Sequence, residues 1–529
     1  MKILTAAEMA AADRRTAEEA GIPLAQLMEA AGSAVASFCL RRYPEASVVI
    51  ALCGKGNNGG DGVVAARVLA RAGRSVKVIL LGSTNEVKGE AATALLRLRA
   101  ETPQVPVIEI ATDEALAEAF NNNGEPANLL LDAVVGTGFK PPLRGLAEAA
   151  RKLVAASNIS VVAVDLPSGW NADSLDQKTD GAYRADAVVT FTAPKLAHVF
   201  GYLTAGPIVV APIGSPDSVI HSEQQLSWTG SSKALAEKPR DPNSNKGKYG
   251  HVLIIGGSYG TAGAPSMSSL AALRTGAGLV TAGVPESIVD LVAAITPELM
   301  VKPLKQGTEG VIALSNLEGD GLDKLLERMT VLAIGPGLSQ RGEIKGVVQQ
   351  LIARSKIPVV LDADGLNAFD DAPHLLNGSD RTLVLTPHPG EMARLAGVTV
   401  KEVEADRIGL ARKFATEHNL TLVLKGWRTL VAHPDGSIAV NTTGNPSMSK
   451  GGSGDILTGI VAAMLAQYPD DMARAVETAV YLHGLAGDFA ARDMDEHTVL
   501  ATDTVAHLSA AFRYRVRDED GLTWICGLR

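Results

Sequence analysis

Short apolar runs alternate with amphipathic segments along residues 47–214. The apolar runs have the length and the β-branched composition of buried strands. Alternation of this kind predicts a parallel sheet with right-handed helical crossovers, in which ligands bind at the carboxyl ends of the strands. The predicted strands are 48–52, 76–81, 105–110, 129–135, 161–165 and 187–192.

A helix is predicted to begin near the start of the chain. Thr5 and Glu8 have the spacing of a capping box, in which each residue satisfies a backbone N–H of the other. The apolar positions that follow at helical intervals are most simply core: Leu24, Leu27, Met28, Ala31, Val35 and Phe38.

The alternation breaks between residues 215 and 247, where the chain is polar, rich in proline and aperiodic. A second strand-helix series begins at His251, and no internal repeat relates it to the first. We therefore predict two unlike α/β domains of three layers each (α/β/α). The expected boundaries are 1–215 for the first domain, 216–245 for a linker, 246–515 for the second domain and 516–529 for a tail without a motif.

Composition excludes several classes of protein. The chain has 529 residues, 46% of them hydrophobic and 20% charged, as in a soluble α/β enzyme. A net charge of −9 argues against a nucleic-acid partner. Three cysteines without a paired pattern indicate a reducing cytoplasm, and no apolar run has the length of a membrane span or a signal peptide core.

Residues 56–62, Gly-Asn-Asn-Gly-Gly-Asp-Gly, follow the first predicted strand. We expect a ligand-binding loop in which four glycines adopt positive φ, followed by a helix that begins at Val63. The asparagine carbonyls are hard oxygen donors, suited to a cation or a hydroxyl. The segment matches neither a P-loop nor a dinucleotide fingerprint.

Polar residues also follow two other strands of the first domain. Asn58, Asp132 and Ser168 together offer oxygens to a monovalent or divalent cation. Asp165 is a candidate general base, since partial burial at the end of an apolar strand is expected to raise its pKa. Strand-end aspartates also cap helices, and glycines also simply turn a chain. Three such motifs at successive strand ends favour a ligand site.

The second domain contains the segment 450–459, Lys-Gly-Gly-Ser-Gly-Asp-Ile-Leu-Thr-Gly. A glycine-rich turn that opens an apolar helix presents N–H groups to a phosphoryl group in transfer. Asp455, in the first turn, is placed to take a proton from a substrate hydroxyl.

His388 is more simply a residue that orients substrate than a metal ligand, because no second His or Cys has metal spacing. Trp427 has two interpretations: it stacks on a nucleotide base, or it packs within the protein. Lys425 either contacts a phosphate group or is an ordinary solvated lysine at a strand end.

The motifs of residues 1–214 resemble those of the NAD(P)H-hydrate epimerase domain, also called the YjeF N-terminal domain. They are Gly-Asn-Asn-Gly-Gly-Asp-Gly, Asp-Ala-x-x-Gly-Thr-Gly from Asp132 and Val-Asp-x-Pro-Ser-Gly from Val164. The resemblance implies a Rossmann-like fold, with potassium on Asn58, Asp132 and Ser168 and with Asp165 beside the substrate. It implies that the hydrated nicotinamide nucleotide contacts Asn57, Asn58, Gly59, Gly60, Asp61, Gly136, Thr137, Gly138, Phe139, Lys140, Pro141 and Pro142.

Residues 246–513 resemble the ribokinase-like superfamily and, within it, the ADP-dependent NAD(P)H-hydrate dehydratase domain. Asp-Ala-Asp-Gly-Leu-Asn from Asp362, Thr-Pro-His-Pro-Gly-Glu from Thr386 and Gly-Gly-Ser-Gly-Asp from Gly451 stand in the expected order. The resemblance implies that the hydrated nucleotide lies at Ala264, Gly337, His388 and Asp455. It implies that the adenine nucleotide lies at Lys425, Gly426, Trp427, Arg428, Thr429 and Gly454.

The two resemblances together imply a bifunctional repair enzyme, an isomerase joined to a lyase. The first domain would interconvert the R and S hydrates of NADH or NADPH. The second would dehydrate the S epimer with ADP and Mg²⁺, giving AMP and phosphate. We expect small-molecule substrates, no nucleic acid or membrane partner, and a homo-oligomer. The alternative is a ribokinase-like kinase for a small alcohol or vitamin, fused to a non-catalytic nucleotide-binding module.

Overall fold

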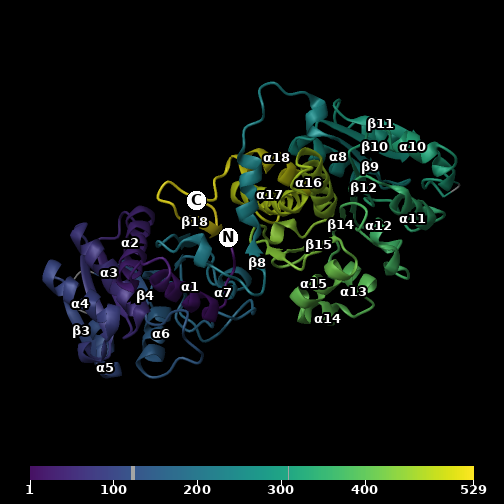
Figure 1. Ribbon diagram of the computed structural model, residues 1–529. Coiled ribbons are helices and arrows are strands. Elements are labelled where there is room, and N and C mark those ends of the chain that lie inside the picture. The colour runs from purple at the N-terminus through teal and green to yellow at the C-terminus, as the bar shows by residue number, and fades with distance from the viewer. Residues whose placement is uncertain (121–125, 308) are drawn as a thin grey trace. The chain divides into compact units, whose positions relative to one another are not determined.

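The computed structural model describes residues 1–120, 126–307 and 309–529. These residues form two compact units, whose elements are labelled in Figure 1. Unit 1 contains Met1–Gln224 together with Arg515–Arg529, and unit 2 contains Gln225–Tyr514.

Unit 1 is built on an eight-stranded sheet in the order β18-β7-β6-β5-β4-β1-β2-β3. All neighbouring strands are parallel except β18, which runs antiparallel to β7. The strands are β1 Val48–Cys53, β2 Ser75–Leu81, β3 Val107–Ile110, β4 Leu129–Ala133, β5 Ser160–Val164, β6 Ala187–Phe191, β7 Ile208–Ala211 and β18 Thr523–Cys526. The helices are α1 Ala6–Glu18, α2 Leu24–Arg42, α3 Asn57–Arg71, α4 Gly89–Glu101, α5 Asp113–Phe120, α6 Leu146–Ala156 and α7 Leu196–Phe200.

The two faces of this sheet bury alternate residues of the same strand. Ala51 and Cys53 of β1 belong to a core cluster that includes residues of α2, α3 and α4. Ile50 and Leu52 belong to a second cluster, with residues of α5 and α6. This period of two places helices on both faces, which gives unit 1 the predicted three-layer α/β/α arrangement.

The glycine-rich segment after β1 is a helix start, and the expected loop is wrong. Helix α3 begins at Asn57, six residues before Val63, and Gly56 has a φ of −93°. None of the four glycines has positive φ. A Cβ on Gly59 would lie 1.9 Å from the carbonyl oxygen of Gly54. The glycines therefore permit close packing of the helix start against the sheet and are not needed for a turn.

Unit 2 contains a ten-stranded sheet in the order β11-β10-β9-β12-β13-β14-β15-β16-β17-β8, in a second three-layer α/β/α arrangement. Only the pairs β15-β16 and β16-β17 are antiparallel. The strands are β8 Leu226–Trp228, β9 His251–Ile255, β10 Leu279–Pro285, β11 Met300–Leu304, β12 Val331–Ile334, β13 Val359–Leu361, β14 Leu383–Leu385, β15 Thr421–Leu424, β16 Leu430–Ala432 and β17 Ile438–Val440. The helices are α8 Gly263–Thr275, α9 Val289–Ala293, α10 Gly321–Leu326, α11 Ile344–Arg354, α12 Asp364–Asn367, α13 Pro389–Ala396, α14 Val400–Ala405, α15 Arg407–Glu417, α16 Ser453–Gln467, α17 Met472–Asp493 and α18 Ala501–Arg513.

The expected linker and the expected tail each contain a strand. Within the expected linker 216–245, β8 pairs with β17 at the edge of the second sheet, and Trp228 donates a hydrogen bond of 2.8 Å to Thr442 Oγ1. The expected tail 516–529 returns to unit 1, where β18 extends the first sheet. Trp524 of β18 packs near Phe38, with ring centroids 6.3 Å apart. Both sheets are thus completed by residues outside their continuous strand-helix series.

In the described part of the chain, no helix combines the length and the apolar character that crossing a bilayer requires.

Candidate active sites

A cavity of about 1000 Å³ opens at the carboxyl ends of the strands of unit 1. The segments after β1, β4, β5 and β6 all contribute, as expected for a parallel sheet. The expected substrate residues that line the cavity are Asn57, Asn58, Asp61, Gly136, Thr137, Gly138, Phe139 and Asp165. The expected residues outside its lining are Gly59, Gly60, Lys140, Pro141 and Pro142.

Lys140 is engaged at the surface. Its Nζ lies 3.1 Å from Asp173 Oδ2 and 3.3 Å from Asn171 Oδ1. An exposed ion pair of this kind contributes little to stability and leaves the lysine free to exchange partners.

Asp165 follows β5 with a φ of 67° and is buried among donors. Its Oδ1 accepts hydrogen bonds of 2.9 Å from Lys195 Nζ and 2.9 Å from Thr190 Oγ1. Its Oδ2 accepts one of 3.0 Å from the Thr137 N–H and another from the Thr137 hydroxyl. His198 contacts the Asp165 carbonyl oxygen through Nε2 at 2.6 Å. The carboxylate is therefore held by four donors.

The expected rise in the pKa of Asp165 is wrong. Burial acts to raise this pKa, but the Lys195 ammonium and the hydrogen-bond donors outweigh it and hold the pKa below its usual value. Hydrogen bonds to the ionised form favour that form. Asp165 is thus a firmly ionised carboxylate with little tendency to take up a proton.

Asp132 and Ser168 are in direct contact, and Asn58 lies beside the segment after β4, where a Cβ on Gly136 would be 3.1 Å from Asn58 Oδ1. Asp132 Oδ1 accepts a hydrogen bond of 2.6 Å from Ser168 Oγ, and its Oδ2 accepts one of 2.7 Å from the Ser168 N–H. Ser168 Oγ also lies 3.2 Å from the Val135 carbonyl oxygen. Within the described ranges, neither Oδ1 nor Nδ2 of the buried Asn58 amide has a hydrogen-bond partner. A buried amide without a partner is costly, so a ligand for it is expected.

The prediction from sequence missed six charged residues that line this cavity: Asp13, Arg14, Glu18, Lys55, Glu90 and Lys195. Lys195 is 1% exposed and follows β6, so its place after the next predicted strand was a usable signal. Asp13 lies on α1, with a buried Oδ1 that has no partner. Asp13 lies on a helix, where polar residues are common, so its position in the sequence did not point to a ligand site.

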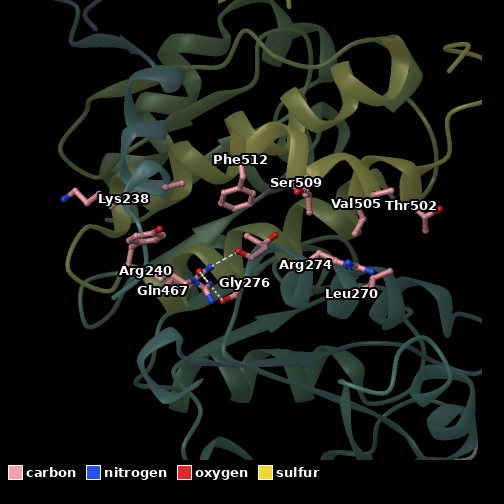
Figure 2. A pocket seen from close by; sticks show the side chains of 15 residues that line it. Lys238, Arg240, Leu270, Arg274, Gly276, Gln467, Thr502, Val505, Ser509 and Phe512 are labelled. Carbon is pink, nitrogen blue, oxygen red and sulfur yellow. Dashed lines mark hydrogen bonds between the residues drawn. The ribbon is translucent and has the colours of Figure 1, made fainter. Parts of the chain in front are cut away.

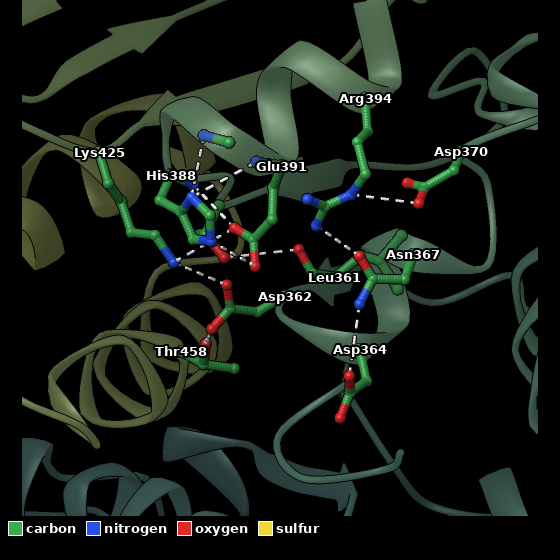
Figure 3. A network of polar contacts seen from close by, with 12 residues as sticks. Leu361, Asp362, Asp364, Asn367, Asp370, His388, Glu391, Arg394, Lys425 and Thr458 are labelled. Carbon is green, nitrogen blue, oxygen red and sulfur yellow. Dashed lines mark hydrogen bonds and ion pairs between the residues drawn. The ribbon is translucent and has the colours of Figure 1, made fainter. Parts of the chain in front are cut away.

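In unit 2, a buried ion pair joins the ends of two strands (Figure 3). Lys425, after β15, lies with its Nζ 3.0 Å from Oδ1 of Asp362, which follows β13. Asp362 Oδ2 accepts a hydrogen bond of 2.7 Å from Thr458 Oγ1 of α16, and Lys425 Nζ lies 3.9 Å from Glu391 Oε2. Lys425 is not a solvated lysine. Although burial lowers its pKa, Asp362 and Glu391 outweigh that effect, and the net pKa is raised.

Asp455 lies in the first turn of α16, whose N-cap Gly452 has a φ of 94°. Burial, with the negative charge of Asp362 and Asp364, raises the pKa of Asp455 to about 6, and Lys425 opposes the rise. No hydrogen bond engages the Asp455 carboxyl among the residues that the structure describes. A carboxylate with a pKa near neutrality suits general base catalysis.

His388 caps α13. Its Nδ1 accepts a hydrogen bond of 3.0 Å from the Gly390 N–H, and its Nε2 lies 3.4 Å from Glu391 Oε1. Glu391 in turn accepts a 2.8 Å bond from the His388 N–H (Figure 3). The ring is thus fixed at the start of a helix, with its side chain 53% exposed.

Ala264 and Gly337 face each other. A Cβ on Gly337, whose φ is 68°, would lie 3.0 Å from Ala264 Cβ. The hydroxyl of Thr261 donates a 2.7 Å hydrogen bond to the Gly337 carbonyl oxygen. A larger side chain at either position would therefore fill the space between the two segments.

The segment after Lys425 leaves an aromatic ring at the surface. Trp427 is 40% exposed, so it is not a core residue, and the Arg428 guanidinium lies 4.3 Å from the centroid of its ring. Thr429 Oγ1 donates a hydrogen bond of 3.3 Å to the Gly426 carbonyl oxygen. An exposed indole beside a cation is a surface on which a planar base can stack.

Another cavity, of about 700 Å³, lies in unit 2, and its lining includes none of the expected dehydratase residues. Figure 2 shows Arg240 there, donating hydrogen bonds of 2.6 Å to the Gly276 carbonyl oxygen and 2.7 Å to Gln467 Oε1. Its guanidinium also lies 3.8 Å from the centroid of the Tyr249 ring. These contacts use N–H donors of this arginine, so fewer of its donors remain for a ligand.

Comparison with known families separates the same two regions. Residues 24–197 match the model of the YjeF-related protein N-terminus, and residues 252–509 match that of NAD(P)H-hydrate dehydratase. A solved structure of ADP/ATP-dependent NAD(P)H-hydrate dehydratase from Bacillus subtilis, co-crystallised with ATP and Mg²⁺, is 31% identical. The similarity covers 55% of this chain and 99% of that one, with a TM-score of 0.47.

Full-length relatives contain both regions in one chain. The bifunctional NAD(P)H-hydrate repair enzyme Nnr of Moorella thermoacetica is 39% identical, over 97% of this chain and 97% of its own length. The enzyme of the same name from Escherichia coli is 35% identical, over 96% of this chain and 93% of its own length. The chain belongs to the family of bifunctional NAD(P)H-hydrate repair enzymes, with an epimerase unit followed by a dehydratase unit.

Proposed function

We propose that unit 2 removes water from the S hydrate of NADH or NADPH at the expense of ADP, and that unit 1 supplies this epimer from the R form. The observation that carries the proposal is the unengaged Asp455 carboxyl at the start of α16, electrostatically coupled to the Lys425–Asp362 pair. A base, a buried cation and a helix start together suit the transfer of a phosphoryl group to a hydroxyl.

The reaction begins at the ring hydroxyl. Water adds to the enamine of reduced nicotinamide with its hydroxyl on the carbon bonded to nitrogen. Asp455 takes the hydroxyl proton as the oxygen attacks the terminal phosphorus of ADP, and AMP leaves. The ring nitrogen lone pair then expels phosphate, and loss of a proton from the adjacent ring carbon restores the double bond. Phosphorylation is useful here because phosphate leaves far more readily than hydroxide.

Three features of unit 2 support these steps. The first N–H groups of α16 have no acceptor within the helix and favour a transferring phosphoryl group. Lys425 offers a positive charge, and Asp362 fixes its position through a 3.0 Å ion pair. Thr458 ties Asp362 to α16. The hydrated nucleotide would contact Ala264, Gly337 and His388, and the adenine nucleotide would follow residues 425–429 and Gly454.

The carboxylates of unit 2 offer Mg²⁺ few protein ligands. In the described ranges, no group of three or more His, Cys, Asp and Glu residues is placed to hold a metal ion. Asp362 already accepts one hydrogen bond on each oxygen. Mg²⁺ commonly keeps several waters and binds one or two carboxylates together with substrate phosphates. The ion would therefore bind mainly through the ADP phosphates and would neutralise their charge.

Potassium fits the epimerase unit better. The buried Asn58 Oδ1 lacks a partner, and the Asp132 carboxylate, the Ser168 hydroxyl and the Val135 carbonyl oxygen lie together. These are hard oxygen donors. The cation would fix the segments after β1, β4 and β5 around the cavity.

The nucleotide requirement tests the proposal. The S hydrate is incubated with protein and either ADP or ATP, and reduced-nicotinamide absorbance, AMP and phosphate are followed. We expect one AMP and one phosphate for each NADPH recovered with ADP. A stable phosphorylated product without recovery of absorbance would contradict the proposal and favour the alternative of a small-alcohol kinase.

A further inference from the structure

The Asp165 carboxylate has little capacity left for a substrate proton. Each oxygen accepts two hydrogen bonds from the protein, from Lys195 and Thr190 on one side and from Thr137 on the other. A carboxylate has about four lone-pair positions. All of them are used before a substrate arrives.

Lys195 is equally occupied. Its ammonium lies 2.9 Å from Asp165 Oδ1, 2.8 Å from Thr190 Oγ1 and 3.3 Å from the Phe191 carbonyl oxygen. An ammonium group has three donors, and three acceptors surround this one. The Lys195–Asp165 pair is thus a fixed electrostatic element and a poor proton carrier.

Two other carboxyls that line the same cavity are not engaged. The buried Oδ1 of Asp13, on α1, has no hydrogen-bond partner among the residues that the structure describes. Asp61, on α3, also lines the cavity, and no hydrogen bond or ion pair to its carboxyl occurs within the described ranges. Both groups are close enough to Asp165 and Lys195 to be coupled to them electrostatically.

We propose that Asp13 and Asp61 are the catalytic proton-transfer pair of the epimerase unit, and that Asp165 with Lys195 positions them and the substrate. This inference rests on the proposed function of unit 1 as the unit that interconverts the R and S hydrates. It replaces Asp165 as the general base.

Ring opening gives the pair a defined task. Asp13, as carboxylate, takes the proton of the ring hydroxyl, and the oxygen forms a carbonyl as the carbon–nitrogen bond breaks. The bonding pair goes to the ring nitrogen, which receives a proton from the Asp61 carboxylic acid. Rotation about the adjacent carbon–carbon bond presents the other face of the carbonyl. On closure, nitrogen attacks that face, Asp61 regains its proton and Asp13 returns its proton to oxygen.

The ionisation of the two groups agrees with these roles. Burial, with the charges of Asp165 and Asp13, raises the pKa of Asp61 well above its usual value, which favours the protonated form that an acid requires. Burial raises the pKa of Asp13 to about 6, with Lys195 opposing this and Asp165 adding to it, so Asp13 is largely ionised at pH 7. The remaining charged residues that line the cavity are Arg14, Glu18, Lys55 and Glu90.

The test measures exchange of the pure R epimer without nucleotide, by following the epimer ratio. Asp61→Asn and Asp13→Asn are each expected to lower kcat by about a hundredfold or more with little change in KM, as for loss of a general acid or base. Asp13→Glu is expected to restore part of the rate. The matched control is Glu118→Gln, which neutralises an exposed carboxylate on α5 of the same unit and should exchange epimers at the wild-type rate.

The wild-type pH profile provides a second measurement that needs no variant. A base and an acid acting together predict a bell-shaped dependence of exchange, with the acidic limb near pH 6. Exchange within threefold of wild type in both Asp13→Asn and Asp61→Asn, or a flat profile from pH 5 to 8, would overturn the pair. A wild-type protein that dehydrates the S epimer without exchanging R for S would instead refute the proposed function of unit 1.

Discussion

Both units set an aspartate at the end of a parallel strand against a lysine from another strand end, buried in unit 1 and partly buried in unit 2. In unit 1 the pair is Asp165–Lys195, and in unit 2 it is Asp362–Lys425, with distances of 2.9 and 3.0 Å. In each unit a second carboxyl, on a helix, has a raised pKa and no hydrogen bond in the described structure. The strand-end aspartate holds the site together, and the helix aspartate is free to move a proton.

The units differ in how firmly the strand-end aspartate is held. Asp165 accepts four hydrogen bonds, two of them from Thr137, whereas Asp362 accepts one from Lys425 and one from Thr458. The pKa of Asp165 is accordingly held below its usual value. The comparison teaches that position at a strand end does not identify the base. Hydrogen bonds to the carboxylate decide which aspartate can take up a proton.

The largest expected effect is that of Asp455→Asn. Loss of the base should reduce ADP-dependent recovery of NADPH by about 10²- to 10⁴-fold while epimer exchange continues, because the two reactions use different units. Asp323→Asn, an exposed carboxyl on α10, is the control and should retain full activity. Wild-type recovery in Asp455→Asn would remove this residue from the mechanism.

Breaking the ion pair of unit 1 tests its positioning role. Lys195→Met leaves the Asp165 carboxylate buried without its cation, which should cost about 3–5 kcal/mol in the free energy of unfolding of unit 1. Denaturant unfolding monitored by hydrogen exchange of β5 and β6 measures this. The double variant Lys195→Met/Asp165→Asn should recover part of the loss. A single variant as stable as wild type would show that the pair is not needed for the fold.

A substitution in the C-terminal strand β18 should lower the stability of unit 1 and leave unit 2 unaffected. Trp524 is 8% exposed and packs near Phe38, so Trp524→Ala should destabilise unit 1 by about 3 kcal/mol. Unit 2, which precedes this strand directly in the sequence, should keep its dehydratase activity. Equal loss in both units would contradict the assignment of residues 515–529 to unit 1.

The glycines after β1 should respond unequally to alanine. A Cβ on Gly59 would meet the carbonyl oxygen of Gly54 at 1.9 Å, whereas one on Gly56 has no neighbour within 4 Å. Gly59→Ala should therefore lower the free energy of unfolding by about 1–3 kcal/mol, and Gly56→Ala by less than about 0.5 kcal/mol. Thermal unfolding of the two variants compares them directly, and equal stability would refute the packing role.

The smallest effect expected is a pH dependence of dehydration. The pKa of Asp455 is raised to about 6, and the base acts only when ionised. The kcat/KM for the S hydrate should thus be constant above pH 7 and fall about tenfold per unit below pH 6. The same raised pKa means that the folded state binds this proton more tightly than the unfolded state, so Asp455 destabilises the fold at pH 7 and less so as pH falls. A rate independent of pH between 5 and 7 would argue against this base.

Local patterns in the sequence predict much of the fold. The capping box of Thr5 and Glu8 is present at α1, and the strands predicted in the first half agree with β1 to β6 to within two residues at each end. The capping box and these strands are determined mainly by residues close together in the sequence, which is why the sequence predicts them. Strand β7 was also not predicted, and strands β8 and β18 were missed because each is short and pairs with a distant partner, β17 or β7.

Sequence motifs indicate where the candidate site residues lie, at strand ends and at one helix start, but they do not give the surroundings of each side chain. Asp165, Asp132 and Asp455 stand in recognisable segments, but the number of donors around each cannot be read from sequence. The glycines after β1 were assigned positive φ, whereas close packing is what requires three of them: Gly59 against Gly54, Gly60 against Met28 and Gly62 against Ala133. Asp13 was missed because its role depends on α1 covering a cavity formed by other segments.

The most direct test of the central claim starts from the pure R epimer with ADP and follows NADPH and both epimers together. The wild-type protein should convert the whole pool to NADPH, Asp455→Asn should produce an R/S mixture without NADPH, and Asp61→Asn should leave the R epimer almost unchanged. Loss of exchange in Asp455→Asn, or full recovery of NADPH from the R epimer by Asp61→Asn at the wild-type rate, would contradict the division of labour between the two units.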